Sequence, residues 1–169
     1  MGYTKCGLFI SEADDDGILD IMASLNIISD KKQCIKSGVT ADLIDEQEIG
    51  ISIQNGWGVV LADPCLDKDY DDDVRALSKN KEIFFWISVS AVDGVMFSYF
   101  ENAQCLRKWV SLEAEVVINE GEAFSDEGIF DAKCGDEDEL DISDILDLCT
   151  KNTGVSSEYM FDGIYDVYR

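Results

Sequence analysis

Two dipeptides set how this chain reverses direction. Asn55-Gly56 and Asp93-Gly94 each separate two runs rich in β-branched and aromatic residues. Such dipeptides favour the tight turns that join neighbouring antiparallel strands. The runs that they join span residues 49–53, 57–62, 83–92 and 95–100. The sequence therefore predicts two β-hairpins, and with them an antiparallel sheet.

Further segments extend this sheet or cover it. A first strand is expected over residues 3–10, and a turn over 101–104 leads into a long strand over 105–118 that completes a meander. Apolar residues recur at helical spacing in three segments, which span residues 11–25, 67–80 and 141–153. Residues 29–48 are polar and are expected to form loops. The aromatic tail over 159–168 is expected to pack back onto the body.

The predicted element order is β-α-ββ-α-βββ-α. Runs of strands interrupted by single helices are typical of the α+β class, in which helices cover one face of an antiparallel sheet. We therefore expect one α+β domain over residues 1–169, with helices packed mainly on one face. A chain of this length is the usual size of a single domain.

Charge excludes several classes of function. The chain carries 36 acidic and 13 basic residues, so its formal net charge is −23, while 46% of its residues are hydrophobic. The hydrophobic fraction excludes a disordered acidic tail. The charge argues against nucleic-acid binding, which needs clustered Lys and Arg to neutralise phosphates. The chain has no histidine, which excludes a Ser-His-Asp triad, a Cys-His pair and a histidine-bound metal.

More than half of the excess charge lies in one stretch. Residues 111–149 hold 14 acids and a single base, Lys133. If the apolar stripe of the last helix faces the core, Asp144 and Asp147 should share a different face. With the acidic run just upstream they would form one patch, which we expect to bind a basic partner; its residues are Asp136, Glu137, Asp138, Glu139, Asp144 and Asp147. The alternative is a solvated face that only aids solubility.

No catalytic, metal or cofactor site is predicted. The six cysteines form no C-x-x-C pair and have no histidine to activate them, so they are interpreted as reduced residues of the core. A secreted disulfide framework is the alternative. Residues 12–20 resemble the start of a calcium loop, but Ala23 stands where the bidentate Glu is required. With 36 acids, a pair of carboxylates for catalysis has no specificity.

The sequence shows no signal for secretion or membrane insertion. The first residues lack a long apolar segment of the secretory type, and no apolar run approaches the roughly 20 residues of a membrane span. We therefore expect a cytoplasmic protein without membrane contact.

A resemblance covers roughly residues 49–122. Its motifs are Trp57-Gly58-Val59-Val60-Leu61, Ala76-Leu77-Ser78, Phe97-Ser98-Tyr99-Phe100, Trp109 and Gly121-Glu122. This pattern resembles small bacterial domains that are similar to immunity proteins of contact-dependent and type VI toxin systems. The chain departs from the pattern at its last turn, where Asn-Ala-Gln stands in place of an expected glycine. The resemblance implies a small, acidic, cytosolic inhibitor and transfers no functional residues.

Charge and resemblance lead to one hypothesis. We expect a binding protein that neutralises a cognate toxin by occluding its basic active-site cleft, with carboxylates in place of phosphates. The partner would be a basic protein. Two alternatives stay open: an acidic regulatory or nucleic-acid-mimic protein with a non-toxin partner, and a small enzyme that uses Asp or Glu.

Overall fold

The computed structural model describes residues 4–25, 28, 33–45, 48–62, 71–113, 115–128, 130 and 142–169. The strands are β1 (Thr4–Ser11), β2 (Cys34–Val39), β3 (Ile49–Gln54), β4 (Trp57–Ala62), β5 (Ile83–Val89), β6 (Gly94–Glu101), β7 (Gln104–Leu112), β8 (Glu115–Gly121) and β9 (Tyr165–Tyr168). The helices are α1 (Asp15–Ser24), α2 (Asp71–Leu77), α4 (Ile142–Thr153) and α5 (Tyr159–Asp162), with 3₁₀ turns η1 (Ala41–Leu43), η2 (Ser78–Asn80) and η3 (Ser90–Val92).

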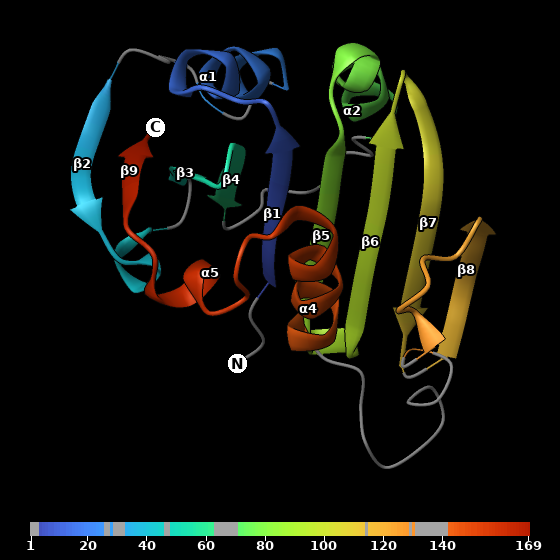
Figure 1. The fold of residues 1–169 in the computed structure, drawn as a ribbon. Helices are drawn as coiled ribbons and strands as arrows, with labels where there is room; N and C mark the ends of the chain where they lie inside the picture. The colour runs from blue at the N-terminus through green and yellow to red at the C-terminus, as the bar shows by residue number, and fades with distance from the viewer. Residues whose placement is uncertain are drawn as a thin grey trace.

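Within the described residues these strands form one nine-stranded sheet in the order β2-β9-β3-β4-β1-β5-β6-β7-β8 (Figure 1). Every pair of neighbours is antiparallel. The prediction of an α+β fold built on an antiparallel sheet is therefore confirmed.

The turns follow the backbone conformation that their residues favour. Asn55 and Gly56 both have positive φ, 52° and 79°, and join β3 to β4 in a two-residue turn. Asn102 and Ala103 take the same conformation between β6 and β7, with φ of 52° and 60°. The second predicted turn is longer, because η3 precedes Asp93, whose φ is 41°. Left-handed conformations of this kind match the twist of antiparallel strands.

Three strands differ from the sequence-based prediction. The long strand expected over residues 105–118 is two strands, because the chain reverses near Glu113, where φ is 52°. Strand β2 lies in the segment predicted to be loop, and its side chains are mostly exposed. Strand β9 lies in the aromatic tail and enters the sheet between β2 and β3. Both β2 and β9 are held by pairing with segments remote in sequence, which a local pattern does not show.

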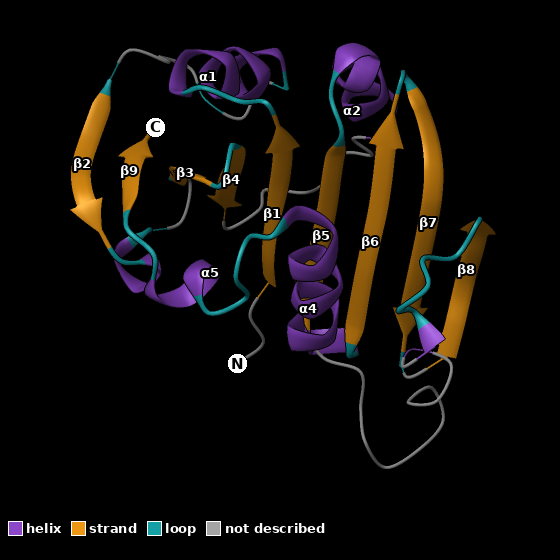
Figure 2. Ribbon diagram, viewed as in Figure 1, coloured by secondary structure: helices purple, strands orange, loops and turns teal. Residues whose placement is uncertain are grey.

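Helices cover both faces of the sheet, and the expectation that they pack mainly on one face is wrong. Residues from α1 and α2 join one apolar core with alternate strand residues such as Leu8, Phe85 and Phe100. Residues from α4 and α5 join a second core, which contains Trp86 and Trp109. Figure 2 shows α4 against the middle of the sheet, with α1 and α2 at one end of the central strands. A strand buried on both faces needs a continuous apolar run, and β5 opens with four consecutive buried residues.

A cluster of ion pairs joins the edge strand β2 to the end of the chain. Glu48 is 2% exposed, and it accepts hydrogen bonds from Lys36 Nζ at 2.8 Å, from Arg169 Nη2 at 3.0 Å and from the Asp45 backbone N–H at 3.0 Å. Burial alone would raise the pKa of Glu48. The hydrogen bonds from Lys36 and Asp45, with the Lys36 charge, outweigh burial and hold that pKa below its ordinary value of 4.5.

This cluster predicts acid sensitivity. Because the folded pKa of Glu48 is depressed, its contribution to stability is fully present above the ordinary value of 4.5 and is lost as the pH falls through the folded pKa. The free energy of unfolding of the wild type should therefore exceed that of Glu48→Gln by an amount that shrinks between about pH 6 and about pH 2. Urea unfolding of both proteins across this range measures the difference. A constant difference would contradict the prediction.

Candidate functional site

The predicted acidic patch is described only in part. Residues Asp136, Glu137, Asp138 and Glu139 lie outside the described residues. On α4, Asp147 is exposed, whereas Asp144 is only 7% exposed and does not share a solvated face with it. The reason is that Leu148, one turn after Asp144, is also buried, so the buried face of the helix is wider than the predicted stripe.

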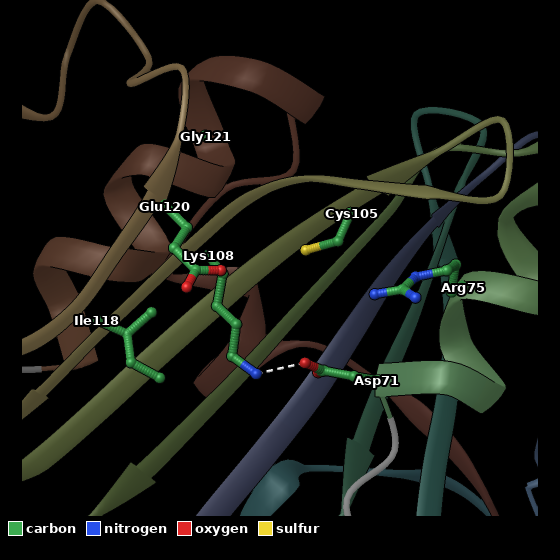
Figure 3. Close-up of a pocket in the computed structure, with 7 residues that line it drawn as sticks. All are labelled: Asp71, Arg75, Cys105, Lys108, Ile118, Glu120 and Gly121. Carbon is green, nitrogen blue, oxygen red and sulfur yellow. Dashed lines mark hydrogen bonds and ion pairs between the residues drawn. The ribbon is translucent and has the colours of Figure 1, made fainter.

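A cavity of about 280 Å³ lies between α2 and the β7–β8 end of the sheet (Figure 3). Helix α2 contributes an acid and a base, β7 a thiol and a base, and β8 an apolar and an acidic side chain. The residues that line it are Asp71, Arg75, Cys105, Lys108, Ile118, Glu120 and Gly121. Helix, strand and edge strand therefore each supply charged groups to one hollow.

Charges within this cavity are largely paired. Lys108 Nζ donates to the Asp71 carboxylate across the gap between β7 and α2. Arg75 contacts the Asp72 carboxylate at 3.3 Å on the same helix. The side chain of Glu120 is exposed at the edge of the sheet. The cavity therefore offers a mixed charged surface, suited to contact with a charged group of a partner.

The cysteine of this cavity is a weak nucleophile. Burial, followed by the negative charge of Asp71, raises the pKa of the Cys105 thiol above its ordinary value of 9.0. Its Sγ donates to the Arg107 carbonyl oxygen at 3.4 Å. A thiol held in the neutral form reacts slowly, because the thiolate is the nucleophilic species. The cavity is therefore better suited to recognition than to cysteine catalysis.

A second cavity, of about 290 Å³, is bordered by carboxylates. It is lined by Ser11, Glu12, Asn80, Lys81, Glu82, Glu101 and Asn102. The Tyr99 hydroxyl donates to Glu82 at 3.1 Å or to Glu101 at 3.4 Å, which brings these two carboxylates together. Burial, then the charge of Glu82, raises the pKa of Tyr99, so the hydroxyl keeps its proton. Lys81 Nζ donates a hydrogen bond to the Glu12 carbonyl oxygen at 2.7 Å.

The structure also places the cysteines and the segment that resembles the start of a calcium loop. Cys6, Cys34, Cys105 and Cys149 hold thiols that are not joined in disulfides. Cys6 and Cys149 are core residues as predicted, whereas Cys34 is exposed on an edge strand, and Cys65 and Cys134 lie outside the described residues. Asp14 caps α1, where its carboxylate accepts from the Gly17 N–H at 2.7 Å.

Two features are absent from the part of the chain that the structure describes. There, no group of three or more Cys, Asp or Glu side chains is arranged to hold a metal ion. Also among those residues, no helix combines the length and apolar character needed to cross a bilayer.

Sequence reasoning missed both cavities. Asp71 and Lys108 are 37 residues apart and meet only because α2 packs beside β7. No spacing rule connects them, although the acidic start of α2 was visible as three consecutive aspartates. No protein family, curated protein or solved structure matches the chain.

Proposed function

We propose that this chain is a binding protein whose acidic surface engages a basic protein partner. One observation carries the proposal: six of the nine Lys and Arg residues that the structure describes contact carboxylates within the molecule. The residues that contact carboxylates are Lys36, Arg75, Arg107, Lys108, Lys151 and Arg169. Because the chain holds 36 acids against 13 bases, these contacts leave few cations to offset the remaining carboxylates. A field of this sign attracts basic partners and speeds their association.

The specific form that we propose is an immunity protein, which neutralises a toxin by covering its active-site cleft. A toxin that acts on nucleic acid must be basic around its substrate groove. Carboxylates of this chain would occupy the groove in place of phosphates. The resemblance of residues 49–122 to immunity proteins of contact-dependent and type VI systems supports this proposal. Asp136, Glu137, Asp138, Glu139 and Asp147 are the proposed contacts, while Asp144 lies inside the free protein.

The test is affinity capture from lysate of the native host at about 0.1 M and about 1 M salt, which shortens the screening length from about 10 Å to about 3 Å. The captured protein is then purified and its activity is titrated with this chain. One partner retained at both salt concentrations, and inhibited at a one-to-one ratio, supports the proposal. Many basic proteins held only at low salt would overturn it in favour of a general mimic of nucleic acid. A retained partner whose activity is unchanged would indicate a regulatory protein.

Reversing charge in the acidic run should slow association. Replacing Asp136, Glu137, Asp138 and Glu139 with Lys should lower the association rate about tenfold or more near 0.1 M salt, because electrostatic steering is lost. The matched control reverses four exposed acids elsewhere, at Asp16, Asp20, Glu158 and Asp162. Stopped-flow mixing with the captured partner measures both rates. Equal effects of the two variants would show that net charge matters and the acidic run does not.

A further inference from the structure

We propose that the partner docks on a partly exposed apolar row that crosses β5, β6, β7 and β8 on the face of α1 and α2. The row consists of Ile87, Met96, Val110 and Ile118. This inference rests on the proposed function for its basic partner, and it is an alternative to contact through Asp147, which α4 carries on the opposite face of the sheet.

Strand register builds this row. Ile87 pairs with Met96, Met96 with Val110, and Val110 with Ile118. Directly paired residues project their side chains to the same face, close enough for contact. Ile87 and Met96 pack against the core that contains α1 and α2, so the row lies on that face.

The row remains accessible because α2 contacts the sheet beside it. Its Asp71 reaches the neighbouring cross-strand row, in which Ser98 pairs with Lys108. All four side chains of the apolar row are partly exposed. Val92 and Leu112 extend the surface, and each is 42% exposed. Contiguous apolar surface of this kind marks interaction sites in soluble proteins.

The sheet ends beside this row. Strand β8 pairs with β7 and, among the described strands, is the last of the sheet. Its side chains are almost all exposed, and those of Val116 and Val117 are 37% and 53% exposed. Val116 pairs with Ser111 and so faces the other side of the sheet, and the row itself ends at Ile118 on an edge strand that another protein can approach from the side.

The charge around the apolar row indicates which kind of protein binds there. The acids around the row are exposed: Asp93, Glu113, Glu115 and Glu120. A second copy of the chain would place the same acids against one another, and like charges brought together at an interface cost several kcal/mol. A partner with apolar side chains at its centre and Lys or Arg at its rim would satisfy both the row and the acids. The proposal therefore commits to a basic protein and against self-association.

The test places a photo-crosslinking phenylalanine derivative at Leu112, beside the row, and separately at Phe161, which is 48% exposed and extends from α5 near the opposite face. Each protein is irradiated in complex with the partner isolated in the salt experiment. Crosslinks from position 112, to a partner peptide that contains Lys or Arg, support the proposal. Replacing Glu113, Glu115 and Glu120 with Lys should also weaken binding about tenfold or more, because complementary charges become repulsive. Reversal of Asp16, Asp20 and Glu158 is the matched control.

The outcomes separate this inference from the proposed function. Crosslinks to the same partner from position 161 alone would overturn the docking surface and leave the proposed function intact. Crosslinks from position 112 to a second copy of the chain would also overturn it. Crosslinks from position 112 to a partner that is not inhibited would keep the surface and reject the immunity function. Failure to isolate any single partner would reject both.

Discussion

Replacing Glu127 with glutamine should lower the free energy of unfolding by about 3–5 kcal/mol, because it leaves a buried guanidinium without its opposite charge. Arg107 is 2% exposed and Glu127 is 5% exposed. Arg107 Nε donates to the two carboxylate oxygens at 2.9 and 3.0 Å, and Nη2 donates to Oε2 at 2.5 Å. The same carboxylate accepts the Phe124 backbone N–H at 2.9 Å.

This ion pair fastens the chain after β8 to the sheet. Arg107 also donates to the Glu120 carbonyl oxygen at 2.7 Å, and its guanidinium carbon lies 5.9 Å from the centre of the Phe97 ring. One side chain therefore links β7, β8 and the segment that carries Phe124. Losing the carboxylate should release that segment as well as exposing the cation to an apolar environment.

Thermal and urea unfolding measure the effect, with Asp126→Asn as the control. Asp126 is the neighbouring residue, but its contact with Lys151 is 3.7 Å long and its side chain is 43% exposed. Exposed pairs contribute about 0–1 kcal/mol, so this variant should remain close to the wild type. The double variant Arg107→Met/Glu127→Leu should be more stable than Glu127→Gln, because no unpaired charge stays buried. If Glu127→Gln lowers the free energy of unfolding as little as Asp126→Asn does, the Arg107–Glu127 pair does not hold the segment after β8 to the sheet.

Local signals predicted the central strands correctly. The turns at Asn55-Gly56 and near Asp93 depend on backbone conformations that a few residues determine by themselves. The strands beside these turns were visible as β-rich runs, because strand preference is also a property of the residues themselves. Glu113 shows where local reasoning ended, because its positive φ reverses the chain without glycine or an Asn-Gly dipeptide to signal it. A single long strand was the natural but wrong prediction there.

The local sequence pattern could not predict which distant segments pair in the sheet. Strand β9 takes its place through contacts such as Tyr168 with Cys34 and with Ile49, more than a hundred residues away in sequence. The side on which each helix packs is also a tertiary property. Alternating residues of β5 enter two different cores, Phe84 with α4 and Phe85 with α1. An apolar run without alternation was the available sign that both faces are covered.

The candidate binding surface, too, could be predicted from the sequence only in part. Net charge and its concentration over residues 111–149 are properties of composition, and the proposal of a basic partner depends on them. The apolar row and the cavity beside it depend on register, since Val110 meets Ile118 across a bulged pair of strands. Asp144 shows the limit of the apolar stripe predicted for the last helix, because Leu148 widens the buried face. Periodicity indicates which side of a helix is buried, but not how much of it.

Replacing Gly121 with alanine should destabilise the protein more than the same change at Gly56, although the two backbones are alike. Both glycines have positive φ, 84° at Gly121 and 79° at Gly56. A side chain in this region costs of order 1–3 kcal/mol wherever it occurs. A Cβ at Gly56 would have no heavy atom within 4 Å, whereas at Gly121 it would lie 1.9 Å from the Leu106 carbonyl oxygen.

The difference between these variants isolates the close approach of β8 to β7. Overpacking adds about 1–3 kcal/mol to the backbone cost, so Gly121→Ala should lose about 2–5 kcal/mol in all. Because Arg107 lies opposite Gly121, amide hydrogen exchange in β8 should also accelerate in this variant and not in Gly56→Ala. Unfolding free energies and exchange rates of the two variants, measured side by side, test this. Equal losses would mean that β8 moves away from β7 freely, and that this edge of the sheet does not hold the apolar row in place.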